Sequence, residues 1–140
     1  MPIKDCEGLT GAKAVWDFTT GDARRFLDRA SLMLHAARSF VHEGVKPDFV
    51  VLLHGAATKF GARAFEGTKF AGDDAANLAE IHTTLLDLTK IGGRIEVCEI
   101  AMQRSDVPRT AVMPFMEIEE NVFVNSIALQ NRGYAYIPIF

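Results

Sequence analysis

Short apolar runs alternate along this chain with longer segments in which apolar residues recur every three or four positions. A short run rich in β-branched or aromatic residues indicates a strand buried on both faces, and the longer spacing indicates an amphipathic helix. Strands that alternate with helices need crossover connections, which favour a parallel sheet between two layers of helices. The sequence therefore predicts an α/β fold, a three-layer α/β/α sandwich with a mainly parallel sheet of about five strands.

The boundaries of the elements follow from these patterns and from glycines that suit the end of a helix. Pro138 lacks an amide hydrogen, so we expect the last strand to lie at an edge of the sheet or to end there. The predicted strands are 12–18, 49–54, 94–98, 115–119 and 134–139, and the predicted helices are 22–43, 74–91, 100–104 and 121–131.

Composition and charge narrow the class of protein. The 140 residues, 49% hydrophobic and 24% charged, fit one domain over 1–140. A net charge of −3 gives no electrostatic reason to bind nucleic acid or an anionic membrane. No apolar run reaches the length of a membrane span, and the first residues lack the apolar stretch of a signal peptide. We expect a cytoplasmic protein with neither nucleic acid nor membrane among its partners.

Two segments fall outside the regular pattern. We expect residues 1–11 to form a flexible N-terminal segment. Residues 55–72 are long for a strand-to-helix loop, which typically has about 2–6 residues, and we expect this segment to carry a short helix of its own. Phe60, Phe65 and Phe70 lie within it, so it suits a lid over a site, a subunit contact or a locally packed flap.

Polar candidates stand where the predicted strands end, and the carboxyl ends of parallel strands are where such sheets bind ligands. Thr19 and Thr20 follow the first strand and suit either an anion site or, together with Asp22, a helix cap. His54 follows the second strand and suits proton transfer or a structural hydrogen bond. Asp17, at the end of the first strand, is placed like a phosphatase nucleophile, but Thr19 stands where a second acid would be needed, and Asp17 suits a cap or turn residue equally well.

Cys98 ends the third strand and precedes a predicted helix, which is a suitable position for a nucleophile. The positive end of a helix dipole stabilises a nearby negative charge by only roughly 0.3–1 kcal/mol. A reactive thiolate would therefore need a further cation or donor, for which Lys59, Arg104 and His54 are candidates. From the residues alone, Cys98 suits either a nucleophile or a small buried core residue.

Metal and cofactor motifs are not evident in the sequence. Cys6 and Cys98 lie far apart without a C-x-x-C motif, and the four histidines show no metal-ligand spacing. The sequence likewise has no phosphate-binding glycine motif and no G-x-S-x-G elbow. We predict neither a metal site nor a bound cofactor.

Four segments together resemble the DsrE/DsrF-like family, which is linked to sulfur relay and intracellular sulfur oxidation. They are VWDFTTG at 15–21, VVLLHG at 50–55, IEVCEIAM at 95–102 and ALQNRGYAY at 128–136. The resemblance runs from about Ala12 to the C-terminus. It implies a five-stranded parallel sheet, and homo-oligomers, commonly trimers or hexamers, with clefts at subunit boundaries. It also implies that Cys98 matches the cysteine that carries sulfur as a persulfide in the sulfur-transferring members.

The leading hypothesis is therefore a persulfide carrier or sulfurtransferase component that uses Cys98, with His54 or Lys59 as supporting residues and with sulfur donor and acceptor proteins as partners. The alternative is a non-catalytic oligomeric module that binds a small anion or nucleotide at the strand rim, where Thr19 and Thr20 lie. Flavin binding by a flavodoxin-like sheet is a third hypothesis. Apolar residues that we expect to be exposed also favour a homo-oligomer: Phe60, Phe65, Phe70, Met113, Phe115 and Phe140.

Overall fold

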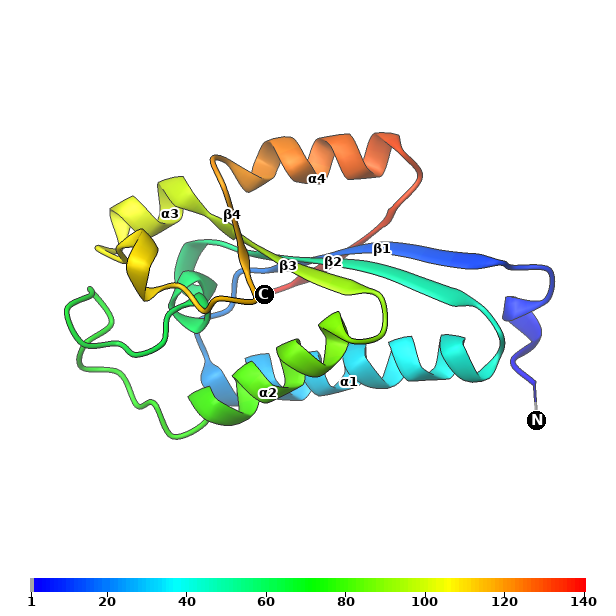
Figure 1. Cartoon of the computed structure of the whole chain (residues 1–140), viewed down its shortest axis with the longest axis horizontal. Helices are drawn as coiled ribbons and strands as arrows, with labels where there is room; N and C mark the ends of the chain where they lie inside the picture. The colour runs from blue at the N-terminus through cyan, green and yellow to red at the C-terminus, as the bar shows by residue number, and fades with distance from the viewer. Residues whose placement is uncertain (1) are drawn as a thin grey trace.

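Five parallel strands form one sheet in the order β4-β3-β2-β1-β5 (Figure 1). The computed structural model describes residues 2–140. The chain crosses the sheet in one direction from β1 to β4 and then returns to place β5 on the other side of β1. The strands are β1 (Gly11–Phe18), β2 (Lys46–Leu53), β3 (Gly93–Cys98), β4 (Glu117–Glu119) and β5 (Ala135–Ile139).

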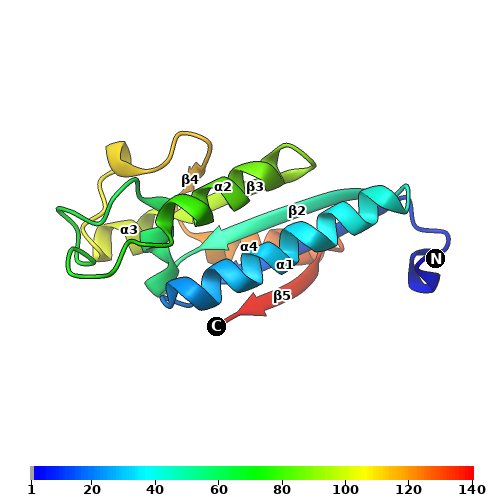
Figure 2. The ribbon, with the colours of Figure 1, turned by 90° about the horizontal axis from the view of Figure 1, so that it is seen from below.

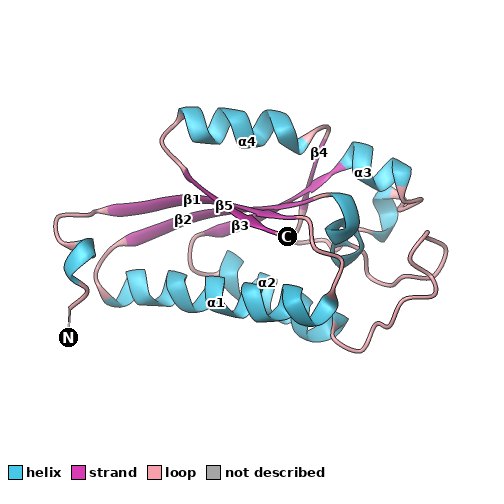
Figure 3. Cartoon of the chain, turned by 180° about the vertical axis from the view of Figure 1, so that it is seen from behind, coloured by secondary structure: helices cyan, strands magenta, loops and turns pink. Residues whose placement is uncertain are grey.

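Helices cover both faces of this sheet, which confirms the three-layer prediction. The long helices α1 (Ala23–His42) and α2 (Leu78–Thr89) lie side by side on one face, as Figure 2 shows. On the opposite face lie α3 (Glu99–Arg104) and α4 (Val122–Asn131) (Figure 3). Gly44 follows α1 with a φ of +75°, the left-handed conformation expected at the end of a helix.

The alternation of side chains along each strand divides the core in two. The larger cluster lies between the sheet and α1 and α2, where the rings of Phe18 and Phe60 each pack 4.5 Å from that of Phe26. The smaller cluster lies under α4 and includes Val15, Leu52 and Cys98. Successive strand residues point to opposite faces, so Asp17 lies on the same face as Val15. The α4 face therefore receives the polar residues near the strand ends.

Several predicted boundaries are wrong by a few residues. Helix α2 begins at Leu78 rather than at position 74, because the Asp74 carboxylate accepts a hydrogen bond from the Ala76 amide at 2.9 Å, a local turn that competes with the helix. Strand β4 covers only Glu117–Glu119 of the predicted 115–119. Strand β5 lies at an edge of the sheet and contains Pro138, as expected.

The long segment 55–72 carries the expected short helix, the 3₁₀ helix η2 (Gly55–Gly61). The prediction that Phe60 and Phe65 are exposed is wrong, because both rings are buried in the larger core cluster. Phe70 is half-buried against the same cluster, so the segment packs on the core as a flap. Met113 and Phe115 are also half-buried, whereas Phe140 is 74% exposed.

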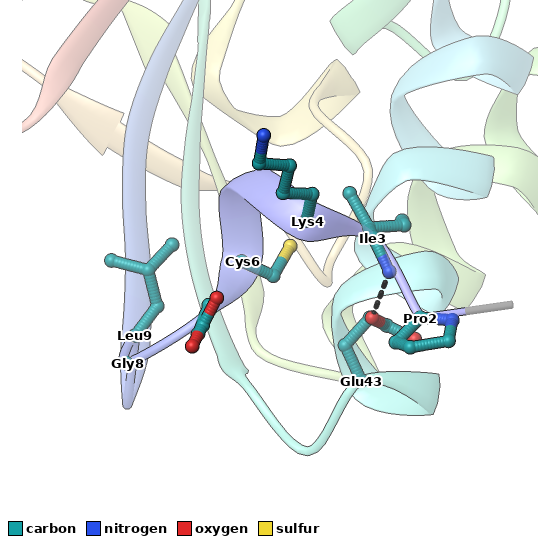
Figure 4. Close-up of a pocket in the computed structure, with 8 residues that line it drawn as sticks. Pro2, Ile3, Lys4, Cys6, Gly8, Leu9 and Glu43 are labelled. Atoms are coloured by element: carbon teal, nitrogen blue, oxygen red, sulfur yellow. Dashed lines mark hydrogen bonds between the residues drawn. The ribbon is translucent and has the colours of Figure 1, made fainter.

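The N-terminal residues lie beside the amino ends of the strands. Residues Lys4–Cys6 form a 3₁₀ turn, η1, and the Ile3 amide donates to the Glu43 carboxylate at 2.5 Å (Figure 4). Cys6 borders a pocket there, at the end of the molecule opposite to α3. The flexibility of this segment stays a prediction, and Met1 lies outside the described residues. A further 3₁₀ turn, η3, covers Arg109–Ala111.

No helix within residues 2–140 is both long enough and apolar enough to cross a lipid bilayer.

Candidate functional site

Cys98 is the last residue of β3 and the residue before α3, as its position in the sequence predicted. Its side chain belongs to the smaller core cluster under α4, and the residue is 6% exposed. It also lines a pocket of about 330 Å³ at the carboxyl ends of β2 and β3. The thiol is therefore sheltered by apolar side chains and still borders a space that a small molecule or sulfur chain could enter.

His54 lines the same pocket from the end of β2. Its Nε2 forms a hydrogen bond with Asp17 Oδ1, and the Tyr136 hydroxyl donates to Asp17 Oδ2 at 2.5 Å. An ionised carboxylate only accepts hydrogen bonds, so Nε2 of His54 carries a proton and donates it to Asp17, which leaves Nδ1 as the other ring nitrogen. Three strands thus contribute one hydrogen-bonded chain that fixes the His54 imidazole beside the pocket.

The electrostatics of this chain keep Asp17 ionised. Burial raises the pKa of its carboxyl, but the hydrogen bonds from His54 and Tyr136 and the charge of His54 together hold that pKa below its ordinary value. The hydrogen bond to Asp17, with burial, raises the pKa of Tyr136 to about 12. Tyr136 is therefore protonated at neutral pH and remains a donor to Asp17.

The rest of the pocket wall combines one cation, two polar side chains and apolar residues. Arg104 and Ser105 come from the end of α3, and Asn121 caps α4 by accepting from the Phe123 amide at 3.1 Å. The ring of Phe123 meets that of His54 edge to face, with 5.5 Å between centroids. The apolar part of the wall is formed by Ile100, Ala101, Val122 and Phe123.

Lys59, proposed from the sequence as a supporting residue, is held elsewhere. Its Nζ donates to Asp73 at 2.8 Å and lies 5.4–5.8 Å from the ring centroids of Phe60, Phe65 and Phe70. Lys59 is nearly buried in the flap and is not among the residues that line the Cys98 pocket. Its position indicates that it holds the flap closed over the core.

Thr19 and Thr20 also lie outside the wall of this pocket. The Thr19 amide donates to the Ile139 carbonyl at 2.9 Å, and the Thr20 hydroxyl accepts from the Asp22 amide at 3.2 Å. Asp22 caps α1 by accepting from the Arg25 amide at 3.1 Å, which confirms the capping interpretation. An acidic side chain therefore already occupies the end of α1 where an anion was considered.

On the side of Cys98 that faces the edge strand β4, the neighbouring residues are acidic. In the sheet Cys98 pairs with Glu119, and Glu96 pairs with Glu117. Burial, together with the charges of Glu119 and Glu117, raises the pKa of Glu96 despite a hydrogen bond from Arg94. Glu99, which follows Cys98, is paired with Arg109. The cation that offsets these charges within the pocket wall is Arg104.

Tyr136 and the pairing of Asp17 with His54 were not predicted from the sequence, and the alternative that Asp17 is a cap or turn residue is wrong. Asp17 is a strand residue that pairs with a histidine and a tyrosine. The signal that could have found it is the parallel alignment itself, which places the ends of β1 and β2 side by side.

Solved structures show which known fold this is. The chain is similar to MTH1491, a protein of unknown function from Methanobacterium thermoautotrophicum, with a TM-score of 0.67 and 16% identity over 91% of this chain and 98% of that one. It is similar to BT1422, a conserved protein of unknown function from Bacteroides thetaiotaomicron, with a TM-score of 0.61 and 15% identity over 91% and 95% of the two chains. The ychN protein from E. coli gives a TM-score of 0.59 and 10% identity over 90% and 98%. The chain therefore has the DsrE/YchN-like fold.

Among curated sequences, an uncharacterized protein of Aquifex aeolicus is 30% identical over 127 residues, which is 90% of this chain and 55% of that protein. The chain thus spans about half the length of this relative. No family model matches the sequence.

Proposed function

We propose that this chain is a small DsrE-like protein that carries sulfur as a persulfide on Cys98, as a sulfur carrier or as a component of a sulfurtransferase. The observation that carries the proposal is the pocket at the end of β3, which Cys98 shares with His54 and Arg104. The resemblance of the segment around Cys98 to the DsrE/DsrF-like family supports it, and so does the common fold.

The proposed reaction exchanges one sulfur–sulfur bond for another. The Cys98 thiolate attacks the terminal sulfur of a donor persulfide, a new bond forms from Cys98 Sγ to that sulfur, and the donor's own sulfur leaves as a thiol after taking up a proton. His54 Nδ1 is the base that accepts the Cys98 proton, while Asp17 stabilises the resulting imidazolium. An acceptor thiolate later attacks the terminal sulfur, and Cys98 leaves as a thiolate. No external oxidant or reductant is needed.

The walls of the pocket suit the loaded state. Ile100, Val122 and Phe123 limit the access of water and of small thiols to the terminal sulfur. Arg104 supplies a positive charge to an anionic persulfide, and Asn121 adds a polar group at the mouth. A carrier of this kind holds sulfur until an acceptor with a thiol narrow enough to enter the pocket binds.

Mass spectrometry after incubation with a small-molecule persulfide donor tests the proposal. Wild-type protein is expected to gain one sulfur atom, and peptide mapping should place it on Cys98. Cys98→Ser should gain none there, whereas Cys6→Ser, the matched loss of the other thiol, should load like the wild type. Equal loading of wild type and Cys98→Ser, or sulfur found only on Cys6, would overturn the proposal.

Arg104 also favours the second candidate, a non-catalytic module that binds a small anion or nucleotide in the same pocket. In that case Cys98 is only a packing residue of the smaller core cluster. Melting temperatures in the presence of phosphate and of a nucleoside monophosphate distinguish the two. An increase that Cys98→Ser retains and Arg104→Ala loses supports anion binding, and no increase with either ligand excludes it.

A further inference from the structure

Three carboxylates meet on the α4 face of the sheet, next to the candidate site but outside its pocket wall. Glu96 comes from β3, and Glu117 and Glu119 come from the adjacent edge strand β4. One oxygen atom from each of the three lies within 4.8 Å of the others. The parallel register explains the convergence, because Glu117 lies directly beside Glu96, and Glu119 follows two residues later on the same face.

Glu96 is the unusual member of this cluster. It is 3% exposed, yet its Oε1 accepts no hydrogen bond from any group within residues 2–140. Its Oε2 accepts from Arg94 Nε at 3.2 Å. A buried carboxylate oxygen without a donor is costly, and native proteins normally provide a partner for such a group. Here the neighbouring strand supplies two more acids instead of a donor.

The charges at this position do not balance. Arg94 offers one positive charge, and it is shared with Asp48, whose carboxylate lies 4.0 Å from the guanidinium. Against it stand the three glutamates, so a net negative charge remains where Glu96 is buried. Glu117 is exposed and Glu119 is half-buried, which leaves the cluster open to solvent along the edge strand.

We propose that Glu96, Glu117 and Glu119 bind a hard divalent cation of the size of Ca²⁺, with the free Oε1 of Glu96 as the buried ligand. Such ions prefer carboxylate oxygens at about 2.3–2.6 Å and complete their coordination with water. Two oxygens bound to one such ion are therefore at most about 5 Å apart, and one oxygen from each of the three glutamates lies within this limit of the others. The smaller Mg²⁺ demands a tighter octahedron and should bind more weakly.

The site is independent of the sulfur-carrier proposal, since it uses none of the residues assigned a role there. A cation would neutralise the repulsion between β3 and the short strand β4, which is held in the sheet by three residue pairs. The expected consequence of binding is therefore a more stable edge of the sheet.

Calorimetric titration of the full chain, freed of metal with EDTA, tests this inference. CaCl₂ is expected to give a saturable signal for one site, MgCl₂ a weaker one, and NaCl of equal ionic strength none. The double variant Glu117→Gln/Glu119→Gln, which changes two solvent-accessible side chains, should bind Ca²⁺ at least about tenfold more weakly. Glu120→Gln removes an exposed carboxylate next to the cluster and should bind like the wild type.

A second measurement uses the melting temperature. It should rise with CaCl₂ in the wild type and in Glu120→Gln, and it should not respond in the double variant or in Glu96→Gln. If Glu96→Gln does not fold, the double variant still decides the question. The proposal fails if the wild type shows no saturable Ca²⁺ signal at millimolar concentration, or if the double variant binds with wild-type affinity.

Discussion

The arrangement around Cys98 follows from side-chain direction in parallel strands. Cys98, His54 and Asp17 come from the ends of three adjacent strands and lie on the α4 face. Asp17 and His54 are polar where the residues before them in the strand are apolar, and Cys98 is reactive but has acidic neighbours. The pairing of Asp17 with His54 therefore follows from the parallel alignment of β1 and β2, since His54 is the first residue after β2.

Asp17→Asn is expected to lower the free energy of unfolding at neutral pH by about 1–3 kcal/mol, because it removes the charge that accepts from His54 and Tyr136. The pKa of Asp17 is lower in the folded protein than its ordinary value of 3.8. The ionised group therefore stabilises the fold above that value, and its contribution is lost as the pH falls through the folded pKa. Urea unfolding at neutral pH and near pH 3 measures the difference between wild type and variant.

The difference should narrow as the pH falls, since Asp17 becomes protonated in the wild type too. Tyr136→Phe is the matched control, because it removes one hydrogen bond and leaves the charge in place. It should lower the free energy of unfolding by about 1 kcal/mol at neutral pH, and this loss should narrow less than that of Asp17→Asn as the pH falls, since the hydrogen bond from Tyr136 is only one of the interactions that lower the pKa of Asp17. A difference for Asp17→Asn that stays constant down to pH 3 would show that the ionised carboxylate does not contribute.

The functional residues at strand ends could be predicted from the sequence where their position in the chain alone indicated the role. His54 was identified because it directly follows an apolar run, and Cys98 because it ends a predicted strand before a helix; the structure brings both to one pocket. The hydrogen bonds of Asp17 were not predicted, because its partners lie 37 and 119 residues further along the chain. Lys59 was considered as a possible cation for the Cys98 thiolate, but its Nζ is held among three phenylalanine rings instead.

At the level of elements, apolar periodicity located each strand and helix, and local hydrogen bonds decided where they end. The hydrogen bond of the Asp74 side chain makes α2 begin later than predicted, and the apolar periodicity does not show this local bond. The burial of Phe60 and Phe65 could not be predicted, because both sit in an irregular segment whose packing depends on contacts distant in sequence. Glycines at tight connections, by contrast, were recognisable from the sequence.

Gly92, between α2 and β3, provides a prediction at this level. Its φ is +112°, and a Cβ there would lie 2.2 Å from the Pro47 carbonyl oxygen. Backbone strain alone costs roughly 1–3 kcal/mol, and the contact with main-chain atoms of β2 adds to it. Gly92→Ala should therefore destabilise the fold by more than this range, as measured by urea unfolding.

Gly44→Ala is the control variant, because it introduces backbone strain at a positive φ without a close contact to other atoms. Gly44 has a φ of +75°, but no atom lies within 4 Å of the position of an added Cβ. The free energy of unfolding of this variant should be lower than that of the wild type by about 1–2 kcal/mol. Equal losses for the two variants would show that the close approach of Gly92 to β2 carries no energetic weight.

For the whole molecule, the two faces of the sheet are covered unequally. Two long helices cover one face, while α4 and the short α3 cover the other. Helix α4 has buried residues on its inner side, and Phe123, Val124 and Ile127 on its outer side are 61–64% exposed. A helix that is apolar all round normally packs against a partner on its outer side as well.

We propose that a second copy of the chain packs on the outer side of α4. The three most exposed large apolar residues after Phe140 (Phe123, Val124 and Ile127) thus lie together on α4, and none of the expected exposed residues of the segment 55–72 is among the exposed ones. Phe123 also lines the Cys98 pocket, so a partner on α4 would place that pocket at a subunit boundary. The family resemblance implies clefts of this kind and an assembly of three or six chains.

Light scattering at micromolar concentration is expected to give a multiple of the 15.4 kDa chain mass for the wild type. Val124→Lys/Ile127→Lys places two charges on the outer side of α4, where burial against a second chain would cost several kcal/mol, so the mass should fall toward that of the monomer. Leu32→Lys, which adds a charge at a 55% exposed position on α1, should leave the assembly intact. A monomeric wild type, or an α4 variant that keeps the wild-type mass, would place the contact elsewhere or exclude it.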